Sequence, residues 1–287
     1  MSAMKVNILL TTFILFTHFI SIAQEVRIES ITNITDSAFT YPSFNKSNNS
    51  IIAQKKVGNH LQLFSISVEG KQIQLTFDSA DHKHAAISPD GKTFAYTKEW
   101  NGQADIHLYS FDNASDRNLT NTPAYYEAHP SWVSDSAIVF NTNRYDTLQE
   151  ISSLNLITGK ITRLTTNTEE DTYGSISPNG QQLVYTKWLD GQRNAEIYLL
   201  SLSDGIEKRI THDPARDVAP VWISDSLISY GRGGNLFLYN VFSKTHTKLI
   251  TGNSEYILAR GVPAGDHKIL CEKIKNRVSA GLVIISF

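Results

Sequence analysis

Short apolar strands recur along the chain, and turn residues separate them. Five of the strands end in Leu-Thr or Ile-Thr: Leu75-Thr76, Leu119-Thr120, Leu164-Thr165, Ile210-Thr211 and Ile250-Thr251. Their threonines lie 44, 45, 46 and 40 residues apart. A period of about 40–45 residues that contains only short strands predicts propeller blades, because a four-stranded sheet cannot bury its faces without neighbours. Helical repeats would show an apolar period of about 3.6 residues instead.

A turn of the Ser-Pro-Asp-Gly kind precedes the second strand of each repeat. It reads Ser88-Pro89-Asp90-Gly91 and Ser177-Pro178-Asn179-Gly180, with shorter versions at Ser134-Asp135-Ser136 and Ser224-Asp225-Ser226. Proline presets φ at the second position and serine bonds back to the backbone, so Asp90 is predicted to be a turn residue. Second strands are predicted at 93–96, 138–140, 183–185 and 227–230, and third strands at 106–111, 151–156, 197–202 and 236–241, with 51–54 and 61–66 in the first blade.

The last repeat breaks off after its third strand, at 282–287. Near the other end, the strand-like run EVRIESITN (25–33) has no hairpin partner of its own, and Ile31-Thr32 lies 44 residues before Thr76, in register with the series. We therefore predict that 26–32 forms the outer strand of the last blade. The expected fold is an all-β, six-bladed β-propeller with four-stranded antiparallel blades, closed by the N-terminal strand.

The first residues are typical of a secretory signal peptide. Lys5 supplies a positive charge, an apolar run follows over 6–20, and Ser21-Ile22-Ala23 places small residues before Gln24. This pattern predicts a cleaved signal at 1–23, a propeller at 24–287 and a periplasmic or secreted protein. An uncleaved membrane anchor is the alternative, and the small residues at the predicted cleavage site favour cleavage. We expect no membrane span after cleavage.

Composition narrows the choice of partner and redox chemistry. A formal net charge of −2 gives no long-range attraction to nucleic acid. The single cysteine, Cys271, excludes an intramolecular disulfide, and its apolar neighbours Ile269 and Leu270 predict a buried strand thiol. A hydrophobic content of 41% with 19% charged residues is typical of a globular chain. We expect a monomer.

Three motifs recur around these strands. They are Ile87-Ser88-Pro89-Asp90-Gly91, Asp105-Ile106-His107-Leu108-Tyr109 and Arg117-Asn118-Leu119-Thr120, joined by His129-Pro130-Ser131-Trp132 and Ala219-Pro220-Val221-Trp222. In these motifs the chain resembles the TolB-like family of six-bladed propellers (PD40, or WD40-like, repeats) from Val26 to Phe287. The resemblance implies the propeller only. We therefore expect neither the N-terminal α/β domain of TolB, for which 24–41 offers no counterpart, nor a Gly-x-Ser-x-Gly hydrolase domain like that of prolyl oligopeptidase relatives.

Aligning the repeats places a set of side chains at one ring position. Three residues before Ile87, Trp132, Ile176 and Trp222 stand His84, His129, Tyr173 and Ala219, with Tyr41 and Ala259 from the outer two blades. Equivalent positions in a ring converge on the central channel, so His84, His129 and Tyr173 are predicted to line its mouth. A metal site of His84 and His129 with Glu127 or Asp171 is an alternative. Because the spacing of known metal sites is missing, we expect no metal and no cofactor.

Charged residues and one tryptophan are predicted to surround this mouth. The entry loops carry Glu127, Asp171, Arg216 and Asp217, and the loops between second and third strands carry Arg144, Trp188 and Arg232. The acids would pair with a partner's cations, the arginines would bind carboxylates, and Trp188 would give apolar anchorage. Packing of these loops against neighbouring blades is the alternative interpretation.

Two functional hypotheses follow. The first is an exported, non-catalytic binding or scaffold propeller whose loop face captures a segment of an envelope protein or a polar ligand. The second is a carbohydrate-active propeller, lyase or hydrolase-like, with its site at the channel mouth and a carboxylate pair such as Glu170-Asp171. Support for nucleophilic catalysis is thin, since Ser131 beside His129 belongs to a repeat strand.

Overall fold

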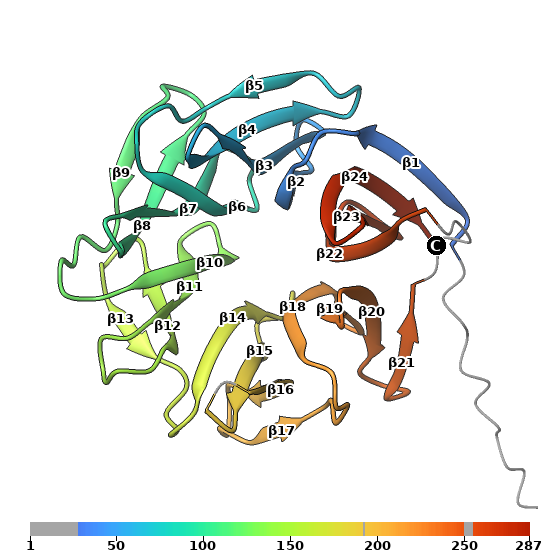
Figure 1. Cartoon of the computed structure of the whole chain (residues 1–287). Helices are drawn as coiled ribbons and strands as arrows, with labels where there is room; N and C mark the ends of the chain where they lie inside the picture. The colour runs from blue at the N-terminus through green and yellow to red at the C-terminus, as the bar shows by residue number, and fades with distance from the viewer. Residues whose placement is uncertain (1–27, 192, 250–254) are drawn as a thin grey trace, which may run out of the picture.

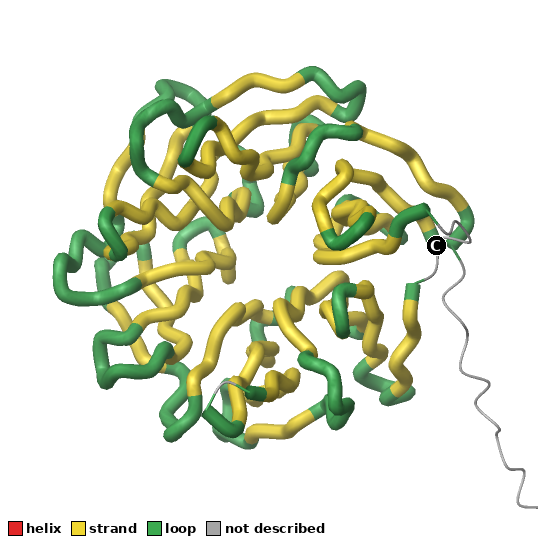
Figure 2. The backbone as a smooth tube through the Cα atoms, in the orientation of Figure 1, coloured by secondary structure: helices red, strands yellow, loops and turns green. Residues whose placement is uncertain are grey.

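A computed structural model describes residues 28–191, 193–249 and 255–287. The predicted signal peptide and the Ile250-Thr251 copy of the repeat lie outside these residues. Within them the chain consists of strands, turns and loops (Figure 2). No helix in the described ranges is long and apolar enough to cross a membrane.

Six four-stranded sheets stand around a common axis (Figure 1). Each sheet is antiparallel, which confirms the predicted six-bladed propeller. From the axis outward, blade one contains β2 (Thr40–Asn45), β3 (Ser50–Val57), β4 (His60–Ser67) and β5 (Gln72–Gln74). Blade two contains β6 (Asp81–Ile87), β7 (Thr93–Trp100), β8 (Gln103–Ser110) and β9 (Asp116–Asn118). Blade three contains β10 (Glu127–Ser134), β11 (Ala137–Thr142), β12 (Glu150–Asn155) and β13 (Ile161–Arg163).

The remaining blades follow the same order. Blade four contains β14 (Glu170–Ile176), β15 (Gln182–Leu189), β16 (Asn194–Ser201) and β17 (Glu207–Arg209). Blade five contains β18 (Asp217–Ser224), β19 (Leu227–Arg232), β20 (Asn235–Asn240) and β21 (Thr245–Lys248). Blade six contains β22 (Ile257–Pro263), β23 (Lys268–Lys275), β24 (Val278–Ser286) and, as its outer strand, β1 (Ser30–Thr35).

The N-terminal strand closes the ring as predicted, but at a shifted register. β1 runs antiparallel to β24, with Ser30 opposite Ser286 and Thr35 opposite Leu282. Leu282 pairs with Glu272 of the second strand, just as Leu63 pairs with Gln54 in blade one. Thr35 therefore occupies the position of the repeat threonines, and the prediction of Thr32 was three residues early. Ile34-Thr35 repeats the dipeptide Ile31-Thr32, which explains the error.

The recurring threonine joins the third strand to the turn that follows the outer strand. In four blades its Oγ1 accepts a hydrogen bond from a third-strand N–H: Leu63 to Thr76 (2.9 Å), Ile106 to Thr120 (3.1 Å), Ile151 to Thr165 (2.9 Å) and Ile197 to Thr211 (2.8 Å). In blade four the Thr211 hydroxyl also donates to Glu196, which is fully buried and pairs with Arg209 at 2.6 Å. The arginine and threonine of this motif, here Arg209 and Thr211, thus both bind a buried carboxylate.

The Ser-Pro-Asp-Gly turn has the predicted form. The Gly91 N–H donates to the Ser88 carbonyl at 2.9 Å, and the Ser88 hydroxyl donates to the Asp90 carboxylate at 2.6 Å. Gly91 has a φ of +74°, which glycine tolerates better than other residues. The Asp90 N–H donates to Asp135 of the next blade at 3.0 Å, so the turn also links neighbouring blades.

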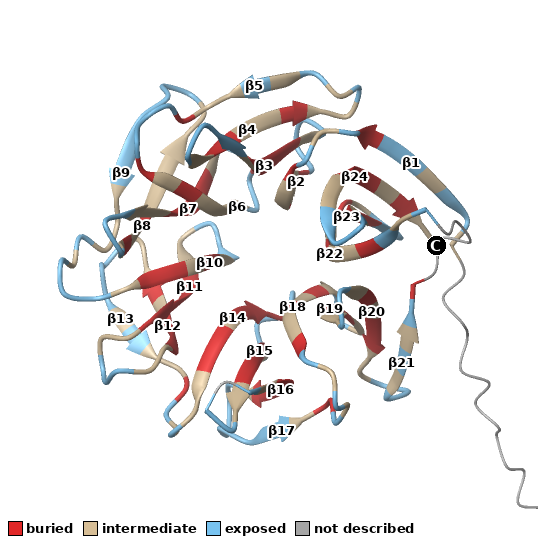
Figure 3. Ribbon diagram, viewed as in Figure 1, coloured by how far each residue is buried: buried red, intermediate tan, exposed pale blue. Residues whose placement is uncertain are grey.

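The core lies between adjacent blades, and in blades one, two, three and six the second strand is the most buried part of the sheet (Figure 3). Trp132 packs between blades two and three, with its indole N–H donating to the Ala86 carbonyl at 2.7 Å. Trp222 packs between blades four and five. Cys271 is fully buried in blade six, as predicted.

Candidate functional site at the centre of the ring

Every inner strand contains one residue in the left-handed backbone conformation. These residues are Tyr41, His84, His129, Tyr173, Ala219 and Arg260, with φ between 46° and 57°. Each lies where the register between the inner and second strands shifts, as at a β-bulge. The conformation is uncommon outside glycine and turns the side chain away from the regular strand direction.

Blade six contributes Arg260 to this set. Ala259, the residue predicted for this position, is therefore wrong by one. The register shift in blade six lies between Ala259 and Val262, so Pro263 is the counterpart of Trp132 and Trp222. Proline gave no sequence signal for that alignment, and Arg260 was missed for this reason.

Hydrogen bonds between blades hold five of these residues in place. The N–H of each donates to a side chain on the second strand of the preceding blade: Tyr41 to Glu272 (2.8 Å), His84 to Gln54 (2.8 Å), His129 to Thr97 (3.1 Å), Tyr173 to Asn141 (3.1 Å) and Ala219 to Thr186 (3.0 Å). Blade five has Gly231 at this position, opposite Leu236, and offers Arg260 no side chain. The ring position is thus set by the fold, whatever side chain it carries.

Five of these side chains meet around the axis and form what we call the central column: Tyr41, His84, His129, Tyr173 and Arg260. Neighbouring ring centroids lie 4.4 Å apart for Tyr41 and His84, 3.9 Å for His84 and His129, and 4.2 Å for His129 and Tyr173. The Arg260 guanidinium carbon lies 3.7 Å from the Tyr41 ring centroid. The structure therefore brings the predicted His84, His129 and Tyr173 together.

Both histidines of the central column are neutral at pH 7. Removal from water lowers the pKa of His129 to about 3, with Lys83 and Arg260 adding to the effect. The pKa of His84 is also well below its ordinary value, chiefly because of burial and then because of His129, Lys83 and Arg260. The column therefore offers hydrogen bonds and ring faces, and its fixed positive charge is the Arg260 guanidinium.

Asn141 determines which nitrogen of His129 carries the proton. The Asn141 side-chain oxygen accepts the Tyr173 N–H, so its NH₂ group faces His129 and donates to Nδ1 at 3.0 Å. The proton of neutral His129 is therefore on Nε2, which can donate. The buried Nδ1 of His84 has no hydrogen-bond partner among the described residues. Such an unsatisfied group is costly and suits an added ligand atom.

Glu272 of blade six lies beside the central column and contacts two of its residues. Its carboxylate accepts the Tyr41 N–H and lies 3.3 Å from the Arg260 Nε. Burial raises the pKa of Glu272 to about 7, even though Arg260 favours the charged form. The net charge of the Arg260–Glu272 pair therefore becomes more positive below neutral pH.

The three predicted rim acids lie inside the blades instead of in exposed loops. Glu127 and Asp217 are the first residues of β10 and β18 and are fully buried. Glu127 pairs with Arg144, and Asp217 accepts two hydrogen bonds from Arg232, at 2.8 and 2.7 Å. Each acid is thus paired with an arginine of its own blade. This corrects the prediction that these acids lie in the entry loops. A role for these four residues in binding stays a prediction.

Asp171 is also fully buried, near the start of β14. Its Oδ2 accepts a hydrogen bond from the Asn167 amide at 2.6 Å, and its Oδ1 has no partner among the described residues. Burial raises the pKa of Asp171 to about 7. A carboxyl group held in this way is an energetic cost above neutral pH.

Replacing Asp171 with Asn should stabilise the protein, and more so at high pH. The pKa of Asp171 is raised above the unfolded value of 3.8, so its contribution to stability falls as pH rises from about 4 through 7. We expect a gain of about 1–3 kcal/mol in the free energy of unfolding at pH 8 and a smaller gain at pH 5. Urea denaturation at several pH values measures this, with Asp112→Asn, an exposed carboxylate, as control. A difference independent of pH would contradict the assignment.

Trp188 and Arg216 contact each other between blades four and five. The half-buried Trp188 indole donates to the Thr172 hydroxyl at 2.8 Å, and the Arg216 guanidinium carbon lies 5.7 Å from its ring centroid. Arg216 also donates to the Arg193 carbonyl at 3.3 Å. The predicted anchoring role of this pair stays a prediction.

The positions of the side chains can be compared with the requirements of a metal site. The described residues contain no group of three or more His, Cys, Asp or Glu side chains placed to hold a metal ion. In the alternative set, His84 and His129 stack on each other, and Glu127 pairs with Arg144.

Comparison with known proteins gives a family and a fold. The family model described as the TolB beta propeller domain (PD40) matches residues 19–195. No curated protein matches the chain.

Solved structures share the architecture at low sequence identity. TolB from Acinetobacter baumannii is 14% identical over 88% of this chain, with a TM-score of 0.58, and this chain spans 55% of that protein. A gluconolactonase from Xanthomonas campestris is 11% identical over 91% of each chain, with a TM-score of 0.70. An oligogalacturonate lyase from Vibrio parahaemolyticus is 13% identical over 89% of this chain and 93% of its own, with a TM-score of 0.56. These likenesses show the propeller fold alone.

Proposed function

Because the chain belongs to the TolB β-propeller family, we propose that it is an exported, non-catalytic binding module that captures a segment of an envelope protein at the central column. Export rests on the signal-peptide pattern of residues 1–23. Capture rests on the column itself, whose five side chains come from five different blades.

The choice of side chains at the ring position supports binding. Ala219 adopts the same backbone conformation as the other five residues, so the fold does not require a large side chain there. The other blades nevertheless place two tyrosines, two histidines and an arginine at this position. Aromatic rings and arginine are the groups that contribute most to binding at protein interfaces. Their convergence on one point is the observation that carries the proposal.

The chemistry of the column fits a peptide segment with an apolar or aromatic residue and a carboxylate. The ring faces would pack against the apolar group, and the His129 Nε2 would donate a hydrogen bond to a carbonyl. Arg260 would bind the carboxylate, with Glu272 in its protonated form at or below neutral pH. The aromatic residues are already placed by hydrogen bonds between blades, and Arg260 is held by the Tyr41 ring and Glu272, so little conformational entropy is lost on binding.

The protonation states of the central column favour binding over catalysis. A general base needs a pKa near the working pH, and the pKa of His129 is about 3. Burial raises the pKa of the Tyr41 phenol well above its ordinary value, so this group also stays neutral. The histidines and Tyr41 are therefore poorly suited to proton transfer at neutral pH, and Glu272, whose pKa is about 7, is engaged by Arg260 and the Tyr41 N–H.

Site-specific photo-crosslinking tests the proposal in the cell envelope. A photoreactive benzoylphenylalanine replaces Tyr173 in one version and Phe77 in the other. Phe77 is 76% exposed and lies just beyond β5, the outer strand of blade one. We expect a polypeptide adduct from position 173 and none from position 77.

Two outcomes would contradict capture at the column. A polypeptide adduct from position 77 alone would place the partner on the outside of the ring. The lack of any polypeptide adduct at position 173, with the photoreactive protein folded and exported, would exclude a protein partner at this point.

A further inference from the structure

Two interfaces between blades hold an indole ring at a position where the interface between blades three and four holds a smaller side chain. The residue three positions after the left-handed residue is Trp132 in blade three and Trp222 in blade five, and each packs against the preceding blade. Blade four has Ile176 at this position. The interface between blades three and four is therefore short of one indole ring.

Blade three, which faces Ile176, also has a smaller side chain at this interface. Trp222 packs in one cluster with Val184, Leu199 and Ile210 of blade four. Val184 pairs with Leu199 across β15 and β16, and in blade three Val139 pairs with Ser153 across β11 and β12. Ser153 is thus the counterpart of Leu199, and the same interface loses a leucine side chain as well.

Blades one and two show how such a loss can be compensated. Ile87 and Ser65 occupy the two corresponding positions there, but Tyr109 and Phe111 pack into the interface. Their counterparts in blade four are Leu200 and Leu202, as the pairing of Leu183 with Leu200 and the Leu202 N–H to Gln181 carbonyl bond show. Leucines therefore stand where blade two has Tyr109 and Phe111, and the tyrosines of this interface, Tyr185 and Tyr198, do not line the cavity.

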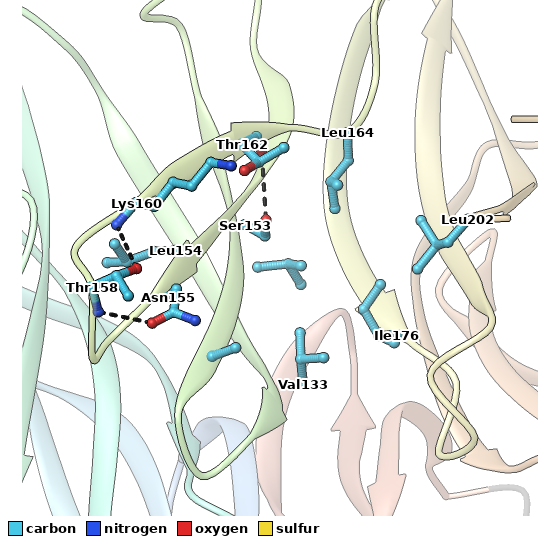
Figure 4. A pocket seen from close by; sticks show the side chains of 12 residues that line it. Val133, Ser153, Leu154, Asn155, Thr158, Lys160, Thr162, Leu164, Ile176 and Leu202 are labelled. Atoms are coloured by element: carbon cyan, nitrogen blue, oxygen red, sulfur yellow. Dashed lines mark hydrogen bonds between the residues drawn. The ribbon is translucent and has the colours of Figure 1, made fainter.

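The result is a cavity of about 340 Å³ between the two blades (Figure 4). Val133, Val139, Leu164, Ile176 and Leu202 form its apolar wall. In Figure 4, Val133, Ile176, Leu164 and Leu202 project toward one space, and Lys160 and Thr162 lie across it. The space that an indole fills in two other interfaces is thus open here, beside a polar edge.

Lys160 gives this edge its charge. Its side chain is exposed, and within the described ranges it makes no ion pair. The residues that line the cavity include no Asp or Glu. An anion held near the cavity mouth would therefore meet a cation with no competing carboxylate in the lining.

From this combination we propose that the cavity between blades three and four is a binding site for a small aromatic carboxylate. The aromatic ring takes the place that Trp132 and Trp222 fill in their two interfaces, against Ile176 and Leu164. The carboxylate pairs with the Lys160 ammonium at the edge. The site lies between the outer parts of two blades and is independent of the central column.

Calorimetric titration of the protein with indole-3-propionate tests the site, with indole and propionate as separate probes. We expect indole-3-propionate to bind, indole to bind at least tenfold more weakly, and propionate to give no measurable heat. Ile176→Trp should fill the cavity, abolish binding and raise the melting temperature. Lys160→Glu should weaken indole-3-propionate at least tenfold and leave indole unchanged.

Lys71→Glu is the matched control, because Lys71 precedes β5 as Lys160 precedes β13, and both carbonyls accept the equivalent N–H. Unchanged affinity in Lys160→Glu, or equal losses in Lys160→Glu and Lys71→Glu, would overturn the proposed carboxylate contact. Should Ile176→Trp fail to fold, the Lys160 and Lys71 variants still decide. No binding of indole-3-propionate to the wild-type protein at millimolar concentration would overturn the site itself.

Discussion

Replacing Ile34 with Asp should destabilise the whole propeller by about 4 kcal/mol or more, because it places an unpaired charge in the core. Ile34 belongs to β1 and is only 6% exposed. It packs in one cluster with Phe39 and Ile51 of the first repeat and with Leu282 of the last strand. The substitution therefore affects the contact that joins the two ends of the chain.

Thr32→Asp is the matched control, since Thr32 lies on the same strand and is exposed. We expect its free energy of unfolding to stay within about 0.5 kcal/mol of the wild-type value. Urea denaturation followed by tryptophan fluorescence measures both variants. Equal stability of Ile34→Asp and Thr32→Asp would show that the N-terminal strand is not part of the folded ring.

Closure by β1 also protects a sheet edge. Without it, β24 would present unpaired N–H and C=O groups on the outside of blade six. The ladder between β1 and β24 has only five residue pairs. The strand is also held by the buried Ile34 and by Lys273, which contacts Asn33 of β1 and Asp36 just beyond it, at 2.6 and 2.5 Å. Local pairing and long-range packing thus support the same closure.

The architecture could be predicted because it repeats. Four threonines of the series, Thr76, Thr120, Thr165 and Thr211, each accept a third-strand N–H, so their spacing reports the blade period. Single positions are less secure. The spacing of 44 residues to Thr76 predicts Thr32, but a second Ile-Thr dipeptide stands three residues later, and only the pairing of Thr35 with Leu282 distinguishes the two.

The candidate site was predictable in part for the same reason. His84, His129 and Tyr173 share an alignment with Ile87, Trp132 and Ile176, which the repeats make visible. Arg260 was missed because Pro263 replaces the aromatic or aliphatic marker. Glu272 was missed because its contact with Tyr41 joins residues from opposite ends of the chain.

The misplaced rim acids show a different limit of the sequence. Glu127 and Asp217 precede apolar strand residues, as exposed loop residues often do. Their burial depends on Arg144 and Arg232, which approach across the neighbouring strand. A charged residue alone does not reveal whether its partner lies within the chain or outside it, because ion pairing satisfies the charge in either case.

The second large effect concerns the central column. Replacing His84 and His129 together with Ala removes the stacked pair at its centre, whose ring centroids are 3.9 Å apart. It also removes the Nε2 donor of His129 and the unpartnered Nδ1 of His84. We expect the double variant to lose at least tenfold in captured partner, because contacts at the centre of an interface carry most of its binding energy.

Folding should survive this change. The inter-blade hydrogen bonds at both positions use the backbone N–H, which alanine retains, and Ala219 already adopts the required conformation. The matched control is His60→Ala with His212→Ala, which removes the exposed His212 and His60, whose side chain is 40% exposed, both outside the central column. Thermal melting of both double variants checks that they remain folded.

The most direct test of the account is affinity capture from an extract of the organism's own cell envelope. Wild-type protein, the His84→Ala/His129→Ala variant and the His60→Ala/His212→Ala control are compared by quantitative mass spectrometry. A polypeptide retained by the wild type and the control, and lost from the His84/His129 variant, is the predicted result. Equal retention by all three proteins would place the partner elsewhere on the propeller and contradict binding at the central column.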